Sequence, residues 1–407
     1  MRPIPSHLPA PAVSAGAGGR LHSLDALRGF DMFWLLGGEQ IVHALCASAA
    51  AGTLAYAVNR QFTHAEWEGF RFYDFIFPLF QFLIGMALPL AIERRLAKGD
   101  SNGRILRHAG VRLGWMIFIG FFIHGNLQSW RMEKMQLSYS VLMMLGLGYM
   151  IAVVLVLFTS VRGQILATAV FLVGYWALQM FVPVPGHEPG LFQEGCVFGD
   201  WLYDHSIGLL GKPWKSPYGR GFPFLPMWTH AATTMMGVFA TYTIAGKWWS
   251  RPSRDAPGSS REGSEAPLVS DSTKLLWLVG LGLGCLLAAW LWSFHLPIVK
   301  NRWTSTFALW CGGLSYLVLA LFWWAIDVKG WHRGLGLWTA IGSNSILAYI
   351  MACLLMGGFG DIARVFLGGL KPHLGDHWHN LVIVLAQFAL AWAVLIHLRR
   401  HKIFLRL

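Results

Sequence analysis

A histidine and three carboxylates stand directly before a long apolar stretch of the chain. His64 is followed by Glu66, Glu68 and Asp74, and the apolar run covers residues 75–91. A run of this length and composition predicts a membrane span, so His64 is expected at the rim of the bilayer. An imidazole in that position can take up and release protons, which is the chemistry of a membrane-embedded enzyme rather than of an anchor.

His64 is therefore the candidate general base or nucleophile. As a neutral imidazole it could deprotonate an amine or a hydroxyl, or attack a carbonyl carbon itself. Glu39 and Asp74, together with Glu66 and Glu68, are the candidates to hold its tautomer and to stabilise the imidazolium. The alternative is an interfacial histidine without a chemical role.

The composition predicts an all-α, polytopic integral membrane protein. Of the 407 residues, 55% are hydrophobic and only 13% are charged, and the mean hydropathy is +0.49. A soluble domain carries about twice that charged fraction. The 21 tryptophans fit this class, because indole rings favour the membrane–water interface. The net charge of +12 does not indicate a nucleic-acid partner, since the basic residues fall in short loops between apolar segments.

Ten apolar segments have the length of a membrane span, which is about 20 residues. Their expected bounds are 27–48, 73–93, 110–125, 137–158, 164–183, 226–246, 275–296, 305–326, 336–358 and 379–398. Residues 360–370 could form an interfacial or re-entrant piece, so ten spans are expected and eleven are possible. Residues 1–22 are expected to be a disordered tail, and the Ser- and Pro-rich residues 251–272 a flexible linker. The linker separates residues 23–250, with six spans, from residues 273–407, with four.

The distribution of basic residues predicts the orientation. Loops on the side of the N-terminus hold most of the lysines and arginines, so both termini, the tail and the linker are expected in the cytoplasm. His64 and Lys300 then fall on the outer side of the membrane, and Asp25 and Arg28 fall near the inner mouth of the first span.

Four motifs, taken together and in order, resemble a known family. They are S-x-D-x-x-R-G at residues 23–29, His64-Ala65-x-Trp67-x-Gly69 followed by Asp74-x-x-Phe77-Pro78, Pro297-x-x-Lys300-Asn301-x-Trp303-Thr304, and Asn344-Ser345-Ile346-Leu347-x-Tyr349. Their types and order resemble the heparan-α-glucosaminide N-acetyltransferases and their bacterial relatives, and the resemblance covers most of the chain.

The resemblance implies an acyltransferase that takes an acetyl group from cytoplasmic acetyl-CoA and delivers it to an amino sugar or glycan across the bilayer. His64 stands at the position of the family's catalytic histidine, and the implied location is a bacterial cytoplasmic membrane with His64 on the periplasmic side. One departure is Glu39, which stands where the lysosomal enzyme carries a functional asparagine. A homodimer is compatible with the family, and nothing in the sequence establishes one.

Four residues are candidates for donor binding. Asp25 and Arg28 lie three positions apart and hence on one helical face, where Arg28 could meet a CoA phosphate and Asp25 orient it. A structural ion pair at the helix mouth is the alternative. Asn344 and Ser345 lie in an otherwise apolar run, so they are expected either to contact the donor or to bond a neighbouring helix.

Four further residues are candidates for acceptor binding. Asn126 could bind sugar hydroxyls, or it could merely shape a turn. Lys300, Asn301 and Trp303 have the composition of a sugar-binding wall, which is also that of an interfacial anchor. No metal is expected, because the three histidines at positions 373, 377 and 379 lack a fourth ligand.

Two other functions compete with acyl transfer. A transporter for a sugar or a lipid-linked sugar fits the span count and the polar residues within spans, although no repeated halves are evident. A membrane scaffold without catalysis leaves the histidine and carboxylates of the outer side unexplained.

Overall fold

The computed structural model describes residues 21–125, 131, 140–188, 190, 192–205, 224–246, 248 and 269–405. These residues are mostly helical, and the extended pairing among them is an isolated bridge between Glu68 and Val299. The all-α prediction is therefore confirmed for this part of the chain.

The elements up to residue 205 are α1 (His22–Phe33), η1 (Trp34–Gly38), α2 (Glu39–Cys46), α3 (Leu54–Gln61), η2 (Phe72–Phe75), α4 (Ile76–Ala97), α5 (Asn102–His124), α6 (Val141–Phe158), α7 (Val161–Phe181) and α8 (Phe198–His205). The elements after it are α9 (Met227–Ala245), α10 (Asp271–Ser293), η6 (Lys300–Arg302), α11 (Ser305–Phe322), η7 (Trp323–Val328), α12 (Gly336–Gly342), α13 (Ser345–Leu354), α14 (Met356–Leu367), η8 (Gly368–Leu370) and α15 (Lys371–Arg400).

Hydroxyl side chains begin many of these helices. In each case the side-chain oxygen accepts a hydrogen bond from a backbone N–H of the first turn, which otherwise has no partner. These N-cap residues are Thr53, Ser101, Ser140, Ser160, Ser270 and Thr304. The sequence thus sets the start of several spans directly.

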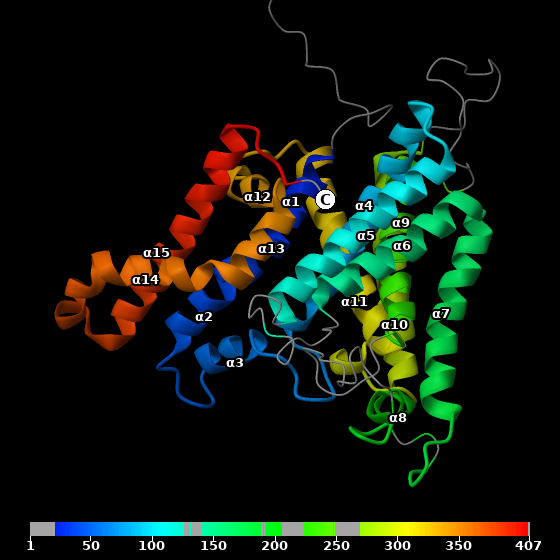
Figure 1. Ribbon diagram of the computed structural model, residues 1–407, viewed down its shortest axis with the longest axis horizontal. Coiled ribbons are helices and arrows are strands. Elements are labelled where there is room, and N and C mark those ends of the chain that lie inside the picture. Colours follow the sequence, from blue (N-terminus) through cyan, green and yellow to red (C-terminus); the bar gives the residue numbers. More distant parts are fainter. Residues whose placement is uncertain are drawn as a thin grey trace, which may run out of the picture.

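The helices form two groups that lie side by side (Figure 1). In the larger group α4 packs along α9, α9 also contacts α6 and α7, and α10 packs along α11. In the smaller group α1 packs against α12, and α15 packs against α14 and α2. Contacts of α1 with α4 and α11 join the two groups, so α1 lies at their boundary.

Glycine permits a close contact between the backbones of α4 and α9. A Cβ atom on Gly85 would lie 1.9 Å from the backbone oxygen of Thr234, and one on Gly237 would lie 1.9 Å from that of Phe82. Small residues at such positions let two helix backbones approach within a membrane. This contact gives the larger group a rigid centre, and residue 74 lies just before the start of α4.

Helices occupy all ten expected spans, but fewer are long and apolar enough to cross a membrane. Seven helices in the described residues are long and apolar enough to cross a membrane. The number is eight if α12 and α13, which are bent by 82° relative to one another, together form one span. The first expected span is divided where Gly37, with φ of 148°, interrupts the helix. The sixth corresponds to α9, which is rich in threonine and almost wholly buried. The polytopic helical class is thus supported, and the exact count of ten remains a prediction.

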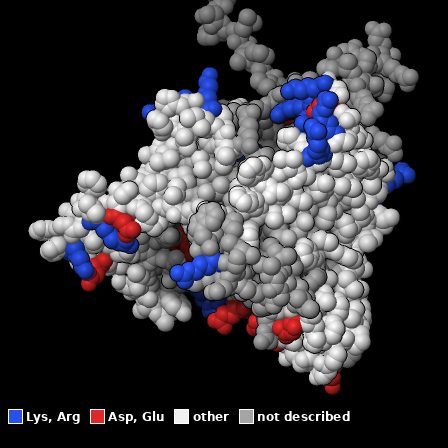
Figure 2. Space-filling model, viewed as in Figure 1, with Lys and Arg blue, Asp and Glu red and all other residues white. Residues whose placement is uncertain are grey.

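The two ends of the molecule differ in charge. The turn between α4 and α5 lies at the end of the molecule that also holds the C-terminus, whereas α3 and α8 lie at the opposite end (Figure 1). Lys and Arg gather most densely over the α4–α5 turn, and Asp and Glu show at the opposite end (Figure 2). Within that turn Asp100 accepts hydrogen bonds from Arg95 and Arg104, each at 2.9 Å.

Candidate active site

The segment between α3 and η2 holds His64 in a loop that its own side chains brace. The Arg71 guanidinium donates to the backbone oxygen of His64 at 2.6 Å and also bonds the hydroxyl of Thr63. The side-chain oxygen of Gln61 accepts the backbone N–H of Phe72 at 3.1 Å. The backbone on both sides of His64 is therefore held by hydrogen bonds from side chains of the same segment.

Asp74 lies beneath His64 and is fully buried, with an exposed fraction of 0%. Its Oδ1 lies 2.8 Å from Nδ1 of His64 and 3.2 Å from Nζ of Lys300. Its Oδ2 accepts the backbone N–H groups of Ala65, at 3.3 Å, and Arg71, at 3.0 Å. A buried carboxylate is stable only when its oxygens are paired, and these four contacts provide that pairing.

A short antiparallel contact brings the chain before η6 to the loop of His64. Glu68 and Val299 form the isolated bridge, and the backbone N–H of Gly69 donates to the oxygen of Ile298 at 2.9 Å. Gly69 has φ of +113°, a conformation that side chains disfavour. This pairing sets Lys300, the next residue of that strand-like segment, opposite the imidazole.

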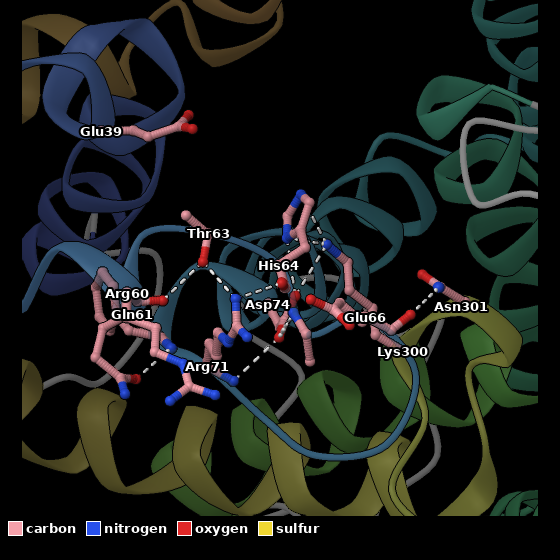
Figure 3. A network of polar contacts seen from close by, with 12 residues as sticks. Glu39, Arg60, Gln61, Thr63, His64, Glu66, Arg71, Asp74, Lys300 and Asn301 are labelled. Carbon is pink, nitrogen blue, oxygen red and sulfur yellow. Dashed lines mark hydrogen bonds and ion pairs between the residues drawn. The ribbon is translucent and has the colours of Figure 1, made fainter. Parts of the chain in front are cut away.

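Lys300 completes a three-residue cluster with His64 and Asp74 (Figure 3). Its ammonium nitrogen lies 2.6 Å from Nδ1 and 3.0 Å from Nε2 of the imidazole. The side chain of Lys300 is only 4% exposed, whereas that of His64 is 50% exposed. Burial lowers the pKa of Lys300, and the charge of Asp74 opposes this shift. The structure thus places Lys300 beside the imidazole, and its expected part in a sugar-binding wall stays a prediction.

The neighbouring Arg302 anchors the same turn to α8. Its Nε lies 2.7 Å from Oδ1 of Asp200, and both side chains are buried. The guanidinium carbon lies 4.9 Å from the centre of the Trp67 ring, and Asp200 also accepts the backbone N–H of Gly195 at 2.7 Å. The turn that carries Lys300 is therefore held from two sides. This ion pair was not predicted from the sequence, because no motif connects the two positions.

Asn301 and Trp303, the other members of the expected sugar-binding wall, also serve internal contacts. The Asn301 amide donates to the backbone oxygen of Glu66 at 3.1 Å. The Trp303 ring is 2% exposed and packs on His230 and Phe77, with ring centres 4.0 and 4.7 Å away. Of the two, only Asn301 lies at the surface of the loop that carries His64, so Trp303 offers no open face to a sugar.

Glu39 faces the cluster from α2 (Figure 3). Its carboxylate lies 3.4 Å from Nε2 of His43, and Nδ1 of His43 lies 2.7 Å from Oδ1 of Asn59. Glu39 also interacts electrostatically with Lys300. Within the described residues, Asp74 is the carboxylate that lies within hydrogen-bond distance of the His64 imidazole.

The expected donor residues lie in two places. Arg28 interacts electrostatically with Asp25 and with Arg112 of α5. Ser345 begins α13 at its bend from α12. Asn344, just before it, is 1% exposed.

The Asn344 amide bonds the C-terminal segment. Its nitrogen donates to the oxygen of Ile403 at 3.0 Å, and its oxygen accepts the N–H of Leu405 at 3.1 Å. The remaining candidate, Asn126, lies outside the described residues. Within the described ranges no three His, Cys, Asp or Glu side chains form a metal-binding group.

Comparison with known proteins finds two curated relatives. The chain is 26% identical over 339 residues to the heparan-alpha-glucosaminide N-acetyltransferase of Mus musculus, which covers 71% of this chain and 48% of the relative. It is 24% identical over 385 residues to the enzyme of the same name from Homo sapiens, with coverages of 81% and 52%. The chain therefore spans about half the length of these relatives. No family model matches the chain.

Proposed function

We propose that this chain, a distant relative of the heparan-alpha-glucosaminide N-acetyltransferases, is a transmembrane acyltransferase. It transfers an acetyl group from cytoplasmic acetyl-CoA to an amino sugar or glycan on the outer side of the membrane. The observation that carries the proposal is the cluster of His64, Asp74 and Lys300, with a half-exposed imidazole over a buried carboxylate and a buried ammonium.

Asp74 favours one tautomer of His64. When Nδ1–H donates to Asp74 at 2.8 Å, Nε2 carries the lone pair, which lies 3.0 Å from the Lys300 ammonium nitrogen. That nitrogen can take a proton from an acceptor amine, or it can attack the acetyl carbonyl itself. Both routes need the same tautomer, and Asp74 would stabilise the imidazolium that forms.

The transfer balances without another reactant. In the direct route the acceptor nitrogen bonds the carbonyl carbon while Nε2 of His64 takes its proton, and the carbon–sulfur bond then breaks. The departing thiolate receives that proton from the imidazolium, which yields the acetylated amine and free CoA. In the alternative route Nε2 attacks the carbonyl carbon and the carbon–sulfur bond breaks, which leaves an acetylimidazolium and the CoA thiolate. The amine then attacks the acetyl carbon, the bond from that carbon to Nε2 breaks, and the proton that the amine loses neutralises the thiolate.

Lys300 would act on the charge that develops during transfer. Its Nζ lies 3.0 Å from the reactive Nε2, so its ammonium can stabilise an oxyanion formed at that position. Glu39, which faces the cluster from α2, would attract the ammonium group of an amino sugar. Asn301 and Asn126 remain our candidates for hydroxyl contacts of the acceptor, and Trp303 supports the site from behind.

The orientation follows from charge. We place the basic α4–α5 turn and both termini in the cytoplasm and the His64 loop outside, in the cytoplasmic membrane of a bacterium. Arg28, with Asp25 beside it, would then meet the CoA phosphates from the inner side. Asn344 and Ser345 would shape that inner region, and a homodimer is compatible with this arrangement.

Purified protein in lipid nanodiscs, incubated with radiolabelled acetyl-CoA and a panel of amino sugars, tests the proposal. We expect acetyl transfer by the wild type, none above background by His64→Ala, and unchanged transfer by the matched control His373→Ala, an exposed histidine of α15. Full activity in His64→Ala would overturn the proposed role. Uptake of an unmodified sugar into vesicles without acetyl-CoA would instead indicate a transporter.

A further inference from the structure

A buried acid in α1 has no use in the mechanism above. Asp31 is 0% exposed, and neither of its carboxyl oxygens has a hydrogen-bond partner among the described residues. An ionised carboxylate in an apolar interior is costly without a partner, and even a neutral acid loses its hydrogen bonds with water. Such a group in the interior of a polytopic helical membrane protein is therefore a candidate for ligand binding.

The helix face that carries Asp31 points away from the tight contact with α12. Gly29 makes that contact, since a Cβ atom there would lie 1.7 Å from the backbone oxygen of Trp338. Successive residues turn by about 100° around a helix, so Asp31 lies on the far side from Gly29. The other helices that α1 contacts include α4 and α11. Asp31 thus faces the boundary between the two helix groups.

The next turn of the same helix leads toward the candidate active site. Nε1 of Trp34 is buried and, in this part of the chain, also lacks a partner. The indole ring packs on Phe62 and Phe72, with ring centres 5.0 and 5.2 Å away. These two rings stand two residues before His64 and Asp74 respectively. Because the indole N–H groups of Trp303, Trp310 and Trp392 also lack partners, Asp31 is the stronger of the two observations.

We propose that Asp31 and Trp34 line the path of the pantetheine arm of the acyl-CoA donor and hydrogen-bond its amide groups. The inference rests on the proposed function, and it names the route by which the acyl group reaches His64. The arm is a mostly apolar chain with two amides, each offering one donor and one acceptor. A carboxyl and an indole N–H at successive turns can bond such groups while the apolar walls cover the rest. Arg28, one turn before Asp31, is then placed for the phosphates.

Binding measurements on the His64→Ala protein in nanodiscs separate this inference from turnover. The probes are radiolabelled acetyl-CoA, S-acetylpantetheine, which carries the arm alone, and adenosine 3′,5′-bisphosphate, which lacks the arm. The variants are Asp31→Leu, Asp31→Asn and Trp34→Phe, with Trp392→Phe as the matched control for the loss of a buried indole N–H.

Loss of one or two hydrogen bonds predicts that Asp31→Leu binds acetyl-CoA and S-acetylpantetheine about tenfold more weakly. Asp31→Asn, which keeps a donor and an acceptor, should stay within about threefold, and Trp34→Phe should weaken binding by about threefold. Trp392→Phe should have no effect, and adenosine bisphosphate should bind every variant equally. Asp31→Asn and Trp34→Phe also keep the test informative if Asp31→Leu does not fold.

Three results would overturn the inference. Unchanged acetyl-CoA affinity in both Asp31→Leu and Trp34→Phe would mean that the carboxyl merely holds a buried water. If the affinity for adenosine bisphosphate falls by the same factor as the affinity for acetyl-CoA, the substitutions disturb the fold. If the parent protein binds no acetyl-CoA at all, the proposed donor fails as well, and the inference falls with it.

Discussion

Nζ of Lys300 lies 2.6 Å from Nδ1 of His64, although the two residues are 236 positions apart in the chain. Nδ1 also lies 2.8 Å from Asp74, so the ammonium and the carboxylate compete for the same ring nitrogen. If Asp74 holds the Nδ1 proton, the ammonium is left to interact with Nε2 and with substrate. If the ammonium instead donates to Nδ1, the proton of the neutral imidazole lies on Nε2, and Nε2 cannot act as a base. The balance between these two arrangements therefore decides whether His64 can take a proton from a substrate.

The pH dependence of acetyl transfer should reveal the charge state of Lys300. Burial lowers its pKa, so the ammonium is lost at a lower pH than that of an ordinary lysine. We expect activity to fall on the alkaline side as the pH rises through that lowered pKa. Lys300→Arg keeps its charge throughout this range, so the alkaline fall should move to higher pH.

Lys300→Met removes the charge and serves as the counterpart. Loss of an oxyanion-stabilising group costs about 10²-fold or more in kcat. The measurement is a kcat profile against pH for the three proteins. An alkaline limb that is identical in wild type and Lys300→Arg would show that another group controls it.

Asp74→Asn should remove the function of His64. The amide nitrogen of asparagine donates a hydrogen bond, so it would favour the tautomer in which Nδ1 accepts and Nε2 carries the proton. We expect kcat to drop by about 10²- to 10⁴-fold, the range of general base catalysis, with little change in acetyl-CoA affinity. The control is Asp361→Asn, an exposed acid paired with Arg364. Equal losses in kcat and in donor affinity would argue for a general structural defect instead.

The buried pair of Arg302 and Asp200 should stabilise the turn that carries Lys300. Removing one partner of a buried ion pair leaves an uncompensated charge and costs about 3–5 kcal/mol. We therefore expect Arg302→Met and Asp200→Leu each to lower the midpoint of thermal unfolding strongly. The double variant should recover part of the loss, because no charge is left unpaired.

Unfolding in detergent, followed for the two single variants and the double variant, gives the coupling between the pair. Additive losses would show that the two side chains act independently. Arg302→Lys keeps the positive charge beside Asp200 but removes the guanidinium that packs on Trp67. We expect this variant to preserve part of the stability and part of the kcat, and the part that is preserved measures the contribution of the ion pair.

The linear pattern of the chain predicted most of the fold. Long apolar runs become helices with little ambiguity, and every expected span is helical in the structure. The breaks were harder to foresee. Gly37 reads as one more small residue in an apolar run, yet its φ of 148° interrupts the first span. Gly342 and Asn344 likewise did not predict the bend of 82° between α12 and α13.

The site was predictable only where its residues are close in sequence. His64 and Asp74 lie ten residues apart at the mouth of one span, so a contact between them was a natural expectation. The position of Lys300 depends on the pairing of Glu68 with Val299, which is set by the tertiary packing of distant helices. For the same reason the sequence offered no indication of the buried pair between Arg302 and Asp200.

Alanine substitutions at glycine should distinguish the α4–α9 contact from the surface that faces lipid. A Cβ atom at Gly85 or Gly237 would lie 1.9 Å from a backbone oxygen of the facing helix, which cannot move aside without shifting the helix. Overpacking of this kind costs about 1–3 kcal/mol, and more where backbone must move. The matched control is Gly280→Ala in α10, where a Cβ atom meets nothing within 4 Å.

We expect Gly85→Ala and Gly237→Ala to lower thermal stability and expression sharply, and Gly280→Ala to be neutral or slightly stabilising because alanine favours the helix. The measurement is the unfolding midpoint of each purified variant. If Gly85→Ala matched Gly280→Ala in stability, the close approach of α4 and α9 would be contradicted. Since α4 follows Asp74 directly, Gly85→Ala protein that still folds should also lose acetyl transfer, because displacement of α4 moves the carboxylate away from His64.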